Sequence, residues 1–228
     1  MLKKTDGIVL SYLRYQETSI ITKVFTRDFG LKSYIINGVR SSKAKSKMAL
    51  YQPLTILEMV VYEKENANIN RISEAKLRQA FQTIPFDFYK SGIAMFMAEV
   101  LSKSIYESYQ NEDLFDFLVQ TIAFLDSEEV YLSHFPIVFL WETSKYLGFS
   151  PDNARGFFEE IQENITNQMD WGKEMQSLNM IIDQSFACRE KIPSKTRRDL
   201  LDHMLLLYSK HLDFNGDWKS VKVLRQLM

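Results

Sequence analysis

The chain is poor in cysteine, glycine and proline: its 228 residues include one Cys, eight Gly and five Pro. The single cysteine, Cys188, excludes both an internal disulfide and a cysteine-rich zinc module. Few glycines and prolines beside ten Met and sixteen Phe favour helices over a loop-rich all-β design. The sequence also lacks an apolar run near the ~20 residues that cross a membrane, and no signal peptide follows the opening Lys3 and Lys4. We therefore expect a cytoplasmic protein without a membrane segment.

The residues that usually carry catalysis are also scarce. His134, His203 and His211 are scattered, and no carboxylate lies between the second and the third at the spacing of metal ligands. No serine or cysteine is flanked by the glycines of a nucleophile elbow, and the sequence contains no glycine-rich phosphate loop. Cys188 follows the apolar run IIDQSFA, which predicts a buried small hydrophobe rather than a reactive thiolate. We expect no enzymatic activity, no metal and no cofactor.

The formal net charge of −1 hides an uneven distribution of charge along the chain. Residues 1–80 contain 14 Lys and Arg against 7 Asp and Glu, a net charge of +7, whereas residues 81–228 have a net charge of −8. Segregation on this scale predicts two parts with different partners. We therefore expect a basic domain at 1–80 and an acidic domain at 81–228.

The basic part is predicted to form a series of short strands. Its segments are rich in Val, Ile, Thr and Tyr, which fit a pleated, half-buried surface. The strands are expected at 7–14, 19–27, 30–38, 53–63 and 68–77. Asp28, Phe29 and Gly30 supply a tight turn, with the glycine at a positive φ. Five short strands in about eighty residues predict a small barrel, because closure removes the unpaired strand edges.

The period of the hydrophobic pattern changes near Pro85. Apolar residues beyond it recur at spacings of three and four, the pattern of one helical face. Helices are expected at 86–105, 114–125, 132–147, 195–212 and 219–227. Asp113 and Ser194 are the expected N-terminal caps, and Gly148 is the expected end of the third helix. The predicted fold class is α+β, a five-stranded barrel followed by an all-α domain.

One stretch of the basic part has functional content: residues 37–54, NGVRSSKAKSKMALYQPL, gather cations between two apolar runs. The basic residues are Arg40, Lys43, Lys45 and Lys47, and no acidic residue interrupts them. Such a run is either a solvated loop or a site for an anion. The run joins two strands of the predicted barrel, and barrels of this kind bind single strands across one face and its loops. We therefore favour a site for nucleic-acid phosphates.

Neighbouring residues extend this candidate site. Lys23 and Lys32 lie on the flanking predicted strands and continue the basic track. Tyr12, Tyr34 and Tyr51 are interleaved with it, either as stacking platforms for bases or as half-buried barrel aromatics. Neutralisation of phosphates by Lys and Arg supplies most of the affinity that is independent of base sequence.

The same stretch resembles the N-terminal domain of RecO, a family of bacterial DNA repair proteins. The step Gly38-Val39-Arg40, the basic segment 43–47 and the following LYQPL match, in order, the family's glycine–small–arginine stretch, basic loop and entry into the next strand. The opening GIVLSYLRYQETSIITKVFTRDFGL is similar to the family's first hairpin. The pieces YLGFSP at 146–151 and WKSVKVL at 218–224 also sit where the family has similar residues, so the resemblance covers the whole chain.

The resemblance implies an OB-fold barrel followed by an α-helical domain, with no enzymatic cofactor. Members of the family anneal complementary strands and, with RecR, help to load RecA onto DNA coated by single-stranded DNA-binding protein (SSB). The expected partners are therefore single-stranded DNA, with double-stranded DNA as a further candidate, RecR, the SSB C-terminal tail and, indirectly, RecA. The implied location is the nucleoid within the cytoplasm.

One departure from the family pattern is plain. Many members hold zinc with two Cys-x-x-Cys pairs after an LGY-x-P element, whereas the corresponding residues 152–175 include no cysteine. Zinc is therefore not expected here. Phe157, Phe158 and Trp171 are expected to supply apolar packing where a metal would otherwise organise a small scaffold.

Our interpretation is a recombination mediator whose basic barrel holds single-stranded DNA and whose helical domain binds protein partners. Lys195, Arg197 and Arg198, at the start of a predicted helix, are candidates for binding the acidic tail of SSB, with a solvated helix end as the alternative. Two other classes stay open: an RNA-binding OB-fold protein, and a scaffold protein with an incidental basic loop. Competition between RNA and DNA for binding distinguishes an RNA-binding protein from a DNA-binding one. Nucleic-acid binding whose affinity does not change with salt concentration would indicate the scaffold protein.

Overall fold

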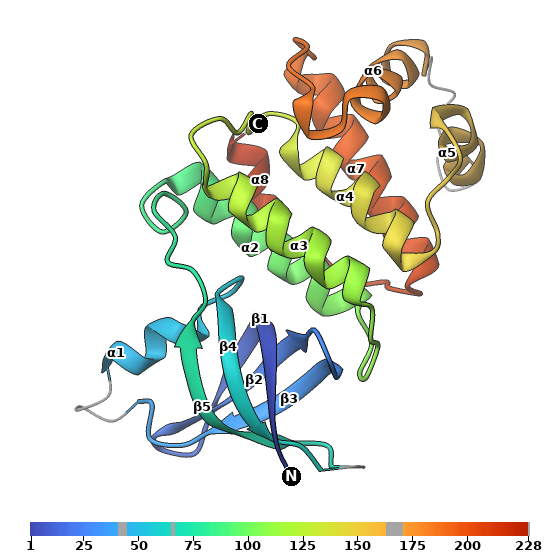
Figure 1. Ribbon diagram of the computed structural model, residues 1–228. Helices are drawn as coiled ribbons and strands as arrows, with labels where there is room; N and C mark the ends of the chain where they lie inside the picture. Colours follow the sequence, from blue (N-terminus) through green and yellow to red (C-terminus); the bar gives the residue numbers. More distant parts are fainter. Residues whose placement is uncertain (41–44, 65–66, 163–170, 228) are drawn as a thin grey trace. The chain divides into compact units, whose positions relative to one another are not determined.

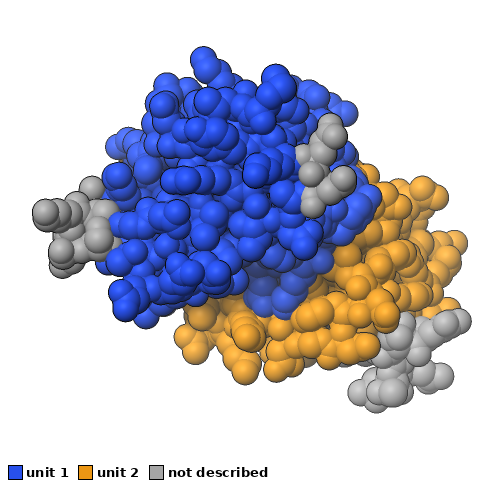
Figure 2. All heavy atoms as spheres, turned by 90° about the horizontal axis from the view of Figure 1, so that it is seen from below, with its two compact units in different colours: residues 1–127 blue, residues 128–228 orange. Residues whose placement is uncertain are grey.

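The structure, a computed structural model, describes residues 1–40, 45–64, 67–162 and 171–227. The chain divides into two compact units, residues 1–127 and residues 128–228 (Figure 2). The first unit contains the strands, a short helical segment and two long helices, and the second unit is built of helices.

Five strands of the first unit form a closed barrel with the order β1–β2–β3–β5–β4 (Figure 1). Their bounds are β1 Leu2–Tyr15, β2 Ser19–Thr26, β3 Gly30–Ile36, β4 Ile56–Tyr62 and β5 Asn70–Leu77. Neighbouring strands pair antiparallel except β3 and β5, which run parallel and are joined by the pairs Tyr34–Asn70 and Ile35–Arg71. The predicted five-stranded barrel is confirmed.

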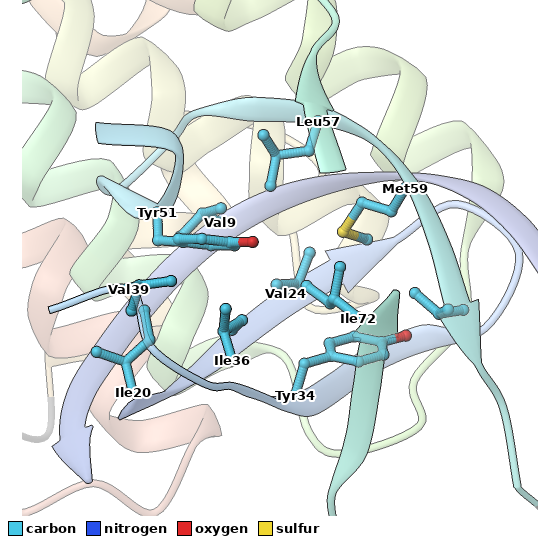
Figure 3. Close-up of a cluster of buried hydrophobic side chains, with 11 residues drawn as sticks. Val9, Ile20, Val24, Tyr34, Ile36, Val39, Tyr51, Leu57, Met59 and Ile72 are labelled. Atoms are coloured by element: carbon cyan, nitrogen blue, oxygen red, sulfur yellow. The ribbon is translucent and has the colours of Figure 1, made fainter. Parts of the chain in front are cut away.

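The barrel interior follows from the alternation of side chains along each strand. On β2, Ile20 and Val24 point inward and are fully buried, whereas Lys23 is exposed. Figure 3 shows the interior cluster, to which all five strands and the connection between β3 and β4 contribute. Its buried members are Val9, Ile20, Val24, Tyr34, Ile36, Val39, Tyr51, Leu57, Met59, Val61 and Ile72. Removal of this apolar surface from water is the main term that stabilises the barrel.

The turn between β2 and β3 depends on a glycine. Gly30 has a φ of +68°, and a Cβ atom at this position would lie 2.3 Å from the carbonyl oxygen of Tyr109. Glycine alone satisfies both the backbone conformation and the close approach. The amide of Leu31 then donates a hydrogen bond to the same oxygen over 3.2 Å. The predicted turn with a positive φ at Gly30 is confirmed.

A short helical segment connects β3 to β4 and closes one end of the barrel (Figure 1). It consists of helix α1, Lys45–Met48, and the 3-10 turn η1, Ala49–Tyr51. Tyr51 is 4% exposed and belongs to the interior cluster (Figure 3), and Met48 and Leu50 pack against that cluster. The basic segment was expected to be a loop throughout; residues 45–48 are instead helical, because this apolar packing draws the end of the segment onto the barrel.

Two helices complete the first unit, α2, Phe88–Ser104, and α3, Glu112–Asp126. Asp87 caps α2 by accepting a hydrogen bond from the amide of Lys90, and Asn111 caps α3 by accepting one from the amide of Leu114. The prediction of Asp113 as a cap is wrong. Asp113 lies in the first helical turn, where an acidic side chain favours the positive end of the helix dipole instead.

Helix α3 is attached to the barrel by an aromatic contact and a double hydrogen bond. The rings of Phe115 and Phe25 on β2 have centroids 6.0 Å apart. The guanidinium of Arg27 donates to both carboxylate oxygens of Asp116 over 3.2 and 3.1 Å. These interactions cover the outer face of the barrel next to the turn between β2 and β3.

The carboxylate of Asp126 fixes the connection between the barrel and α2. One oxygen accepts a hydrogen bond from the amide of Gln82 over 2.8 Å, and the other accepts from the amides of Thr83 and Ile84 over 2.9 Å each. Burial alone would raise the pKa of Asp126, but these bonds to the ionised form outweigh it and hold the pKa below its usual value. Asp126 therefore has a structural role: its buried carboxylate holds the connection before α2 in place.

The second unit is helical along its described length (Figure 1). Its elements are α4 Phe135–Leu147, α5 Ala154–Ile161, α6 Gly172–Gln184, the 3-10 turn η3 Ser185–Ala187, α7 Ser194–His211 and α8 Val221–Leu227. Gly148, with a φ of +82°, ends α4 as predicted. Ser194 was expected to cap α7, but Pro193 occupies the cap position and Ser194 is the first helical residue. The capping prediction is therefore wrong.

An aromatic cluster packs α5 within the second unit. Phe157 and Phe158 are buried, with exposed fractions of 0% and 1%. The ring of Phe157 lies 6.3 Å from that of Trp141 in α4, and the ring of Phe158 lies 5.0 Å from that of Trp171, measured between centroids. The expected apolar packing of Phe157, Phe158 and Trp171 is confirmed. The sequence did not predict α5, which carries two of these residues.

The change from strands to helices falls where the hydrophobic period changes. The last strand ends at Leu77 and α2 begins at Phe88, on either side of Pro85. The division into compact units falls after Ser127, because α2 and α3 group with the barrel. The domain boundary near residue 80 stays a prediction.

Candidate nucleic-acid interface

Lys23, one of the predicted site residues, points outward from the barrel into solvent. The strand register places it opposite Ser11 on β1 and Ser33 on β3, on the outer face. Its side chain is exposed and forms no ion pair with any residue that the structure describes. An ammonium group flanked by small hydroxyl side chains leaves room for a phosphate to approach.

Lys32 lies on the same strand pair but on the other face. Its register partner is the interior residue Val24, so Lys32 points to the mouth of the barrel rather than to the outer face. Its ammonium nitrogen lies 3.6 Å from a carboxylate oxygen of Glu63 and 3.3 Å from the hydroxyl of Ser108. The structure therefore separates Lys32 from Lys23 and gives it a carboxylate partner.

The basic segment after β3 begins at Arg40, which is hydrogen-bonded to the turn between β1 and β2. The amide of Arg40 donates to the carbonyl of Thr18 over 3.0 Å, and its guanidinium donates to the carbonyl of Gln16 over 3.2 Å. Both partners are uncharged, so Arg40 keeps its full charge while its position is fixed. Lys47 is exposed on α1. Lys45 begins that helix, and Lys43 lies outside the described residues.

Most of the predicted stacking platforms are not accessible. Tyr34 is fully buried in the barrel, and Tyr51 is 4% exposed, so neither ring can stack on a base. Burial raises the pKa of Tyr51 to about 12. Both are core residues, and stacking by them is ruled out. Tyr12 is 37% exposed and keeps an accessible ring.

Several other cations of the barrel are already neutralised by carboxylates. Arg27 pairs with Asp116 and Glu112, and the hydrogen bond and charge of Asp116 raise the pKa of Arg27. Arg78 pairs with Asp6 and Lys76 with Glu58, each over 2.7 Å. The barrel cations without a carboxylate partner in the described chain are Lys3, Lys4, Arg14, Lys23, Arg40, Lys47, Lys64 and Arg71.

The sequence analysis did not assign a binding role to five of these cations, Lys3, Lys4, Arg14, Lys64 and Arg71, or to the exposed ring of Tyr62. Lys64 and Arg71 flank the connection between β4 and β5, and Tyr62 at the end of β4 is 43% exposed. Period-two alternation was the available signal, since Leu57, Met59 and Val61 point inward and thereby turn Tyr62 outward.

The predicted protein-binding cations lie at the start of α7 and mostly contact their own helix. Lys195 pairs with Asp199 over 2.6 Å. The guanidinium of Arg197 donates to the carbonyl of Ile192 and to the hydroxyl of Ser194. Arg198 is exposed, and its Nε donates to the carbonyl of Ser194 over 3.3 Å. The structure thus brings the three cations to one helix end.

The histidines and the cysteine are dispersed within the second unit. His203 contacts Glu174 over 2.9 Å, His211 contacts Glu160, and His134 contacts the carbonyl of Glu190 over 2.7 Å. No group of three His, Cys, Asp or Glu side chains that could hold a metal ion occurs among the described residues. Cys188 is 2% exposed, which confirms its predicted burial. The expectations of no metal and no catalysis stay predictions.

In the described part of the chain, no helix combines the length and the apolar character that crossing a membrane requires. The predicted compartment stays a prediction.

Two family models match the chain. The model described as Recombination protein O N terminal matches residues 1–81, and the model described as Recombination protein O C terminal matches residues 85–160. Among curated relatives, a DNA repair protein RecO of Flavobacterium johnsoniae is 38% identical and one of Flavobacterium psychrophilum is 36% identical, each over 98% of both chains. A DNA repair protein RecO of Bacteroides fragilis is 37% identical over 73% of this chain and 71% of its own length.

Proposed function

The chain belongs to the RecO family of DNA repair and recombination proteins, and from this premise we propose that it is a non-enzymatic mediator that binds single-stranded DNA and anneals complementary strands. The observation that carries this proposal is the set of exposed barrel cations that have no carboxylate partner among the described residues, above all Lys23, Arg40 and Lys47. Cations that are not neutralised within the protein are available to phosphates.

The arrangement of these cations suits binding that ignores base sequence. Lys23 is flanked by serines on both neighbouring strands, and Arg40 is held by backbone carbonyls of the adjacent hairpin. Phosphate contacts set the position of a strand and carry no direct sequence information. A protein that holds two strands by their phosphates lowers their mutual repulsion and leaves the bases free to search for register. Annealing follows from these two properties without a catalytic residue.

We extend the proposal to protein partners on the basis of family membership. The chain is proposed to act with RecR in loading RecA onto DNA coated by SSB, and to bind the acidic C-terminal tail of SSB. Lys195, Arg197 and Arg198 are the proposed contacts for that tail. Of the three, Arg198 is exposed and bonded only weakly to its own helix, whereas Lys195 already has Asp199 as a carboxylate partner. Arg198 is therefore the first residue to test.

The proposed binding activity is tested by titrating a labelled single-stranded oligonucleotide with the full chain at several salt concentrations. Between about 50 and 200 mM salt the affinity should fall steeply, because each phosphate contact releases condensed counterions. Annealing is measured in parallel with two complementary oligonucleotides, and two non-complementary ones serve as the control.

Two results would contradict the proposal. Affinity that does not change with salt would favour a scaffold protein whose basic segment is incidental. Stronger competition by RNA than by DNA of the same sequence would favour an RNA-binding protein, because the 2′-hydroxyl is the group that distinguishes the two.

A further inference from the structure

A row of outward-facing side chains crosses every strand of the barrel. The strand register places its members side by side, in the order Leu13 on β1, Ile21 on β2, Ile35 on β3, Arg71 on β5, Tyr62 on β4 and Leu2 at the start of β1. All are exposed or partly exposed, and all but Arg71 are apolar or aromatic. The solvated face of an antiparallel sheet is normally polar. A row on that face that is apolar or aromatic at every position but Arg71 therefore indicates a binding surface.

A hollow of about 450 Å³ lies on this row, where β3 and β5 close the barrel. We call it the seam hollow. Its lining residues are Ile35, Tyr62, Lys64, Ile69, Asn70, Arg71, Ile72 and Ser73. A volume of this size is within the range of pockets that take small organic groups.

The seam hollow offers apolar and aromatic surface to solvent. Tyr62 is 43% exposed and Ile69 is 46% exposed. Ile35, on the adjacent strand β3, is partly exposed. A flat ring that entered the hollow would contact these side chains and remove their apolar surface from water. Aromatic side chains that stand free on a barrel face are the usual platforms for unpaired bases.

The charged side chains among the described lining residues of the hollow are of one sign. Arg71 and Lys64 are exposed and form no ion pair with any described residue. The carboxylate of Glu63 does not neutralise them, because its side chain is 10% exposed and lies toward Lys32 and Asn70. No acidic side chain is among the described lining residues. The occupant is therefore expected to carry negative charge beside its flat ring.

The base of the hollow is held in place by an asparagine. The side-chain oxygen of Asn70 accepts a hydrogen bond from the amide of Lys64 over 3.2 Å, and its amide nitrogen donates to Glu63 over 3.3 Å. Asn70 is itself 3% exposed. These bonds tie the end of β4 to the start of β5, so that Tyr62 and Arg71 face the hollow before any ligand binds.

The hollow is continuous with the candidate DNA track. Lys23 lies opposite Ser33, and Ser33 is two residues from Ile35 on the same outer face of β3. Arg71 is the neighbour of Ile35 on β5. Two strand spacings and two residues separate the backbone of Lys23 from that of Arg71, a distance of roughly 12 Å. A strand held at Lys23 therefore reaches the hollow within a few nucleotides.

We propose that the seam hollow binds one unpaired base of single-stranded DNA, which stacks on Tyr62 and contacts Ile35 and Ile69, while Arg71 and Lys64 bind the adjoining phosphates. This inference rests on the proposed function and adds a base-binding position to a surface otherwise defined by phosphate contacts. A protein segment is the other conceivable occupant. The pair of cations, which have no acidic partner among the described residues, and the link to Lys23 favour nucleic acid.

The test compares two oligonucleotides of equal length and charge, one of thymidines and one of abasic sites, in binding to the full chain. Tyr62→Ala should weaken binding of the thymidine oligonucleotide about 5- to 150-fold, the range expected when one base no longer stacks, and leave binding of the abasic one unchanged. Arg71→Ala should weaken binding of both and lower the salt slope by roughly 0.7. Phe88→Ala, which truncates an aromatic side chain that is 66% exposed outside the barrel, is the matched control.

The remaining outcomes each overturn a different statement. Equal binding of thymidines by wild type and Tyr62→Ala overturns the base site. Equal weakening for thymidine and abasic oligonucleotides overturns stacking, because only a structural effect would act on both. Absence of binding by the wild type would instead overturn the proposed function itself. Thermal unfolding curves of each variant establish that the fold is kept.

Discussion

The two units of the molecule place their large apolar side chains differently. In the described chain, every strongly exposed large hydrophobic residue lies at or before Tyr106, within the first unit. The aromatics of the second unit are buried or partly buried where the structure describes them: Trp141, Phe157 and Tyr208 are at most 2% exposed, and Phe149 and Trp218 are half-buried. A side chain that stays exposed despite the hydrophobic effect is available to a ligand. We therefore expect binding through apolar surface at the first unit.

Paired cations occur in both units, and the second unit also exposes cations without a carboxylate partner among the described residues, such as Lys173 and Lys191. In the second unit, Lys145, Lys195 and Arg225 each have an acidic partner within 2.7 Å. In the barrel, the cations that carry the proposed function, such as Lys23 and Lys47, have no such partner among the described residues. A cation that is already paired with a carboxylate of the protein attracts an external anion less strongly. Exposed aromatics and unpaired cations thus occur together on the barrel.

The largest effect is expected from breaking the core of the second unit. Phe157→Ala removes a fully buried ring that packs against Trp141 and Phe158, and should lower the free energy of unfolding by about 3–5 kcal/mol. Denaturant titration measures the loss. Phe86→Ala, at a residue that is 85% exposed, should change the free energy by at most about 0.5 kcal/mol.

The same two variants sharpen the comparison between the units. At low denaturant, where Phe157→Ala is still folded, its affinity for a single-stranded oligonucleotide should equal that of the wild type. A chelator should leave the unfolding curves of both unchanged, since aromatic packing rather than zinc is expected to organise this region. A large drop in DNA affinity in Phe157→Ala would mean that the second unit shares the binding surface.

A smaller effect is expected from loosening the first unit. Asp126→Asn replaces the oxygen that accepts from the amide of Gln82 with an amide group, which leaves that donor without its partner. The free energy of unfolding should fall by about 1–3 kcal/mol, measured by denaturant titration. Asp113→Asn, at the exposed residue wrongly expected to cap α3, is the matched control and should cost less than about 1 kcal/mol. Equal losses would contradict the role assigned to Asp126.

The smallest effect is a pH dependence that belongs to the second unit. Burial lowers the pKa of His134 below its usual 6.5, so the unfolded chain binds a proton that the folded chain does not. Stability should therefore fall as pH drops from about 6.5 toward the folded pKa, by at most about 1.4 kcal/mol per pH unit. Urea unfolding at several pH values measures this slope, which His134→Asn should make shallower. If His134→Asn has the same slope as the wild type, the pH dependence of stability comes from other titratable groups.

The sequence predicted the fold through two periodicities. Alternation along β2, with Val24 inward and Lys23 outward, and the three-and-four spacing beyond Pro85 both reflect which side chains must leave water, and both agree with the structure. Single caps were harder to predict. Asn111 and Asp113 are both good capping types, and the extended backbone that selects Asn111, with φ −155° and ψ 104°, is not encoded by residue type alone.

The candidate site was only partly accessible to sequence reasoning. Composition identified the cations but not their partners, because Glu63 reaches Lys32 and Asp116 reaches Arg27 only after folding. For the same reason, the sequence left Tyr51 open between a stacking platform and a barrel aromatic, and the structure places it in the core. Tyr62 was visible in the alternation of β4, yet its value as a platform depends on Arg71, which the pairing of β4 with β5 places beside it.

The most direct test of the account is the salt dependence of single-strand binding when the basic segment is neutralised. The variant replaces Arg40, Lys43, Lys45 and Lys47 together with alanine. A control with the same change of charge replaces four exposed lysines of the second unit, Lys173, Lys191, Lys219 and Lys222. The account predicts weaker binding by the first variant for every base sequence, with a salt slope flatter by roughly 0.7 for each phosphate that is no longer neutralised, and nearly unchanged binding by the control. Identical slopes and affinities for wild type and the first variant would contradict the assignment of DNA binding to this segment.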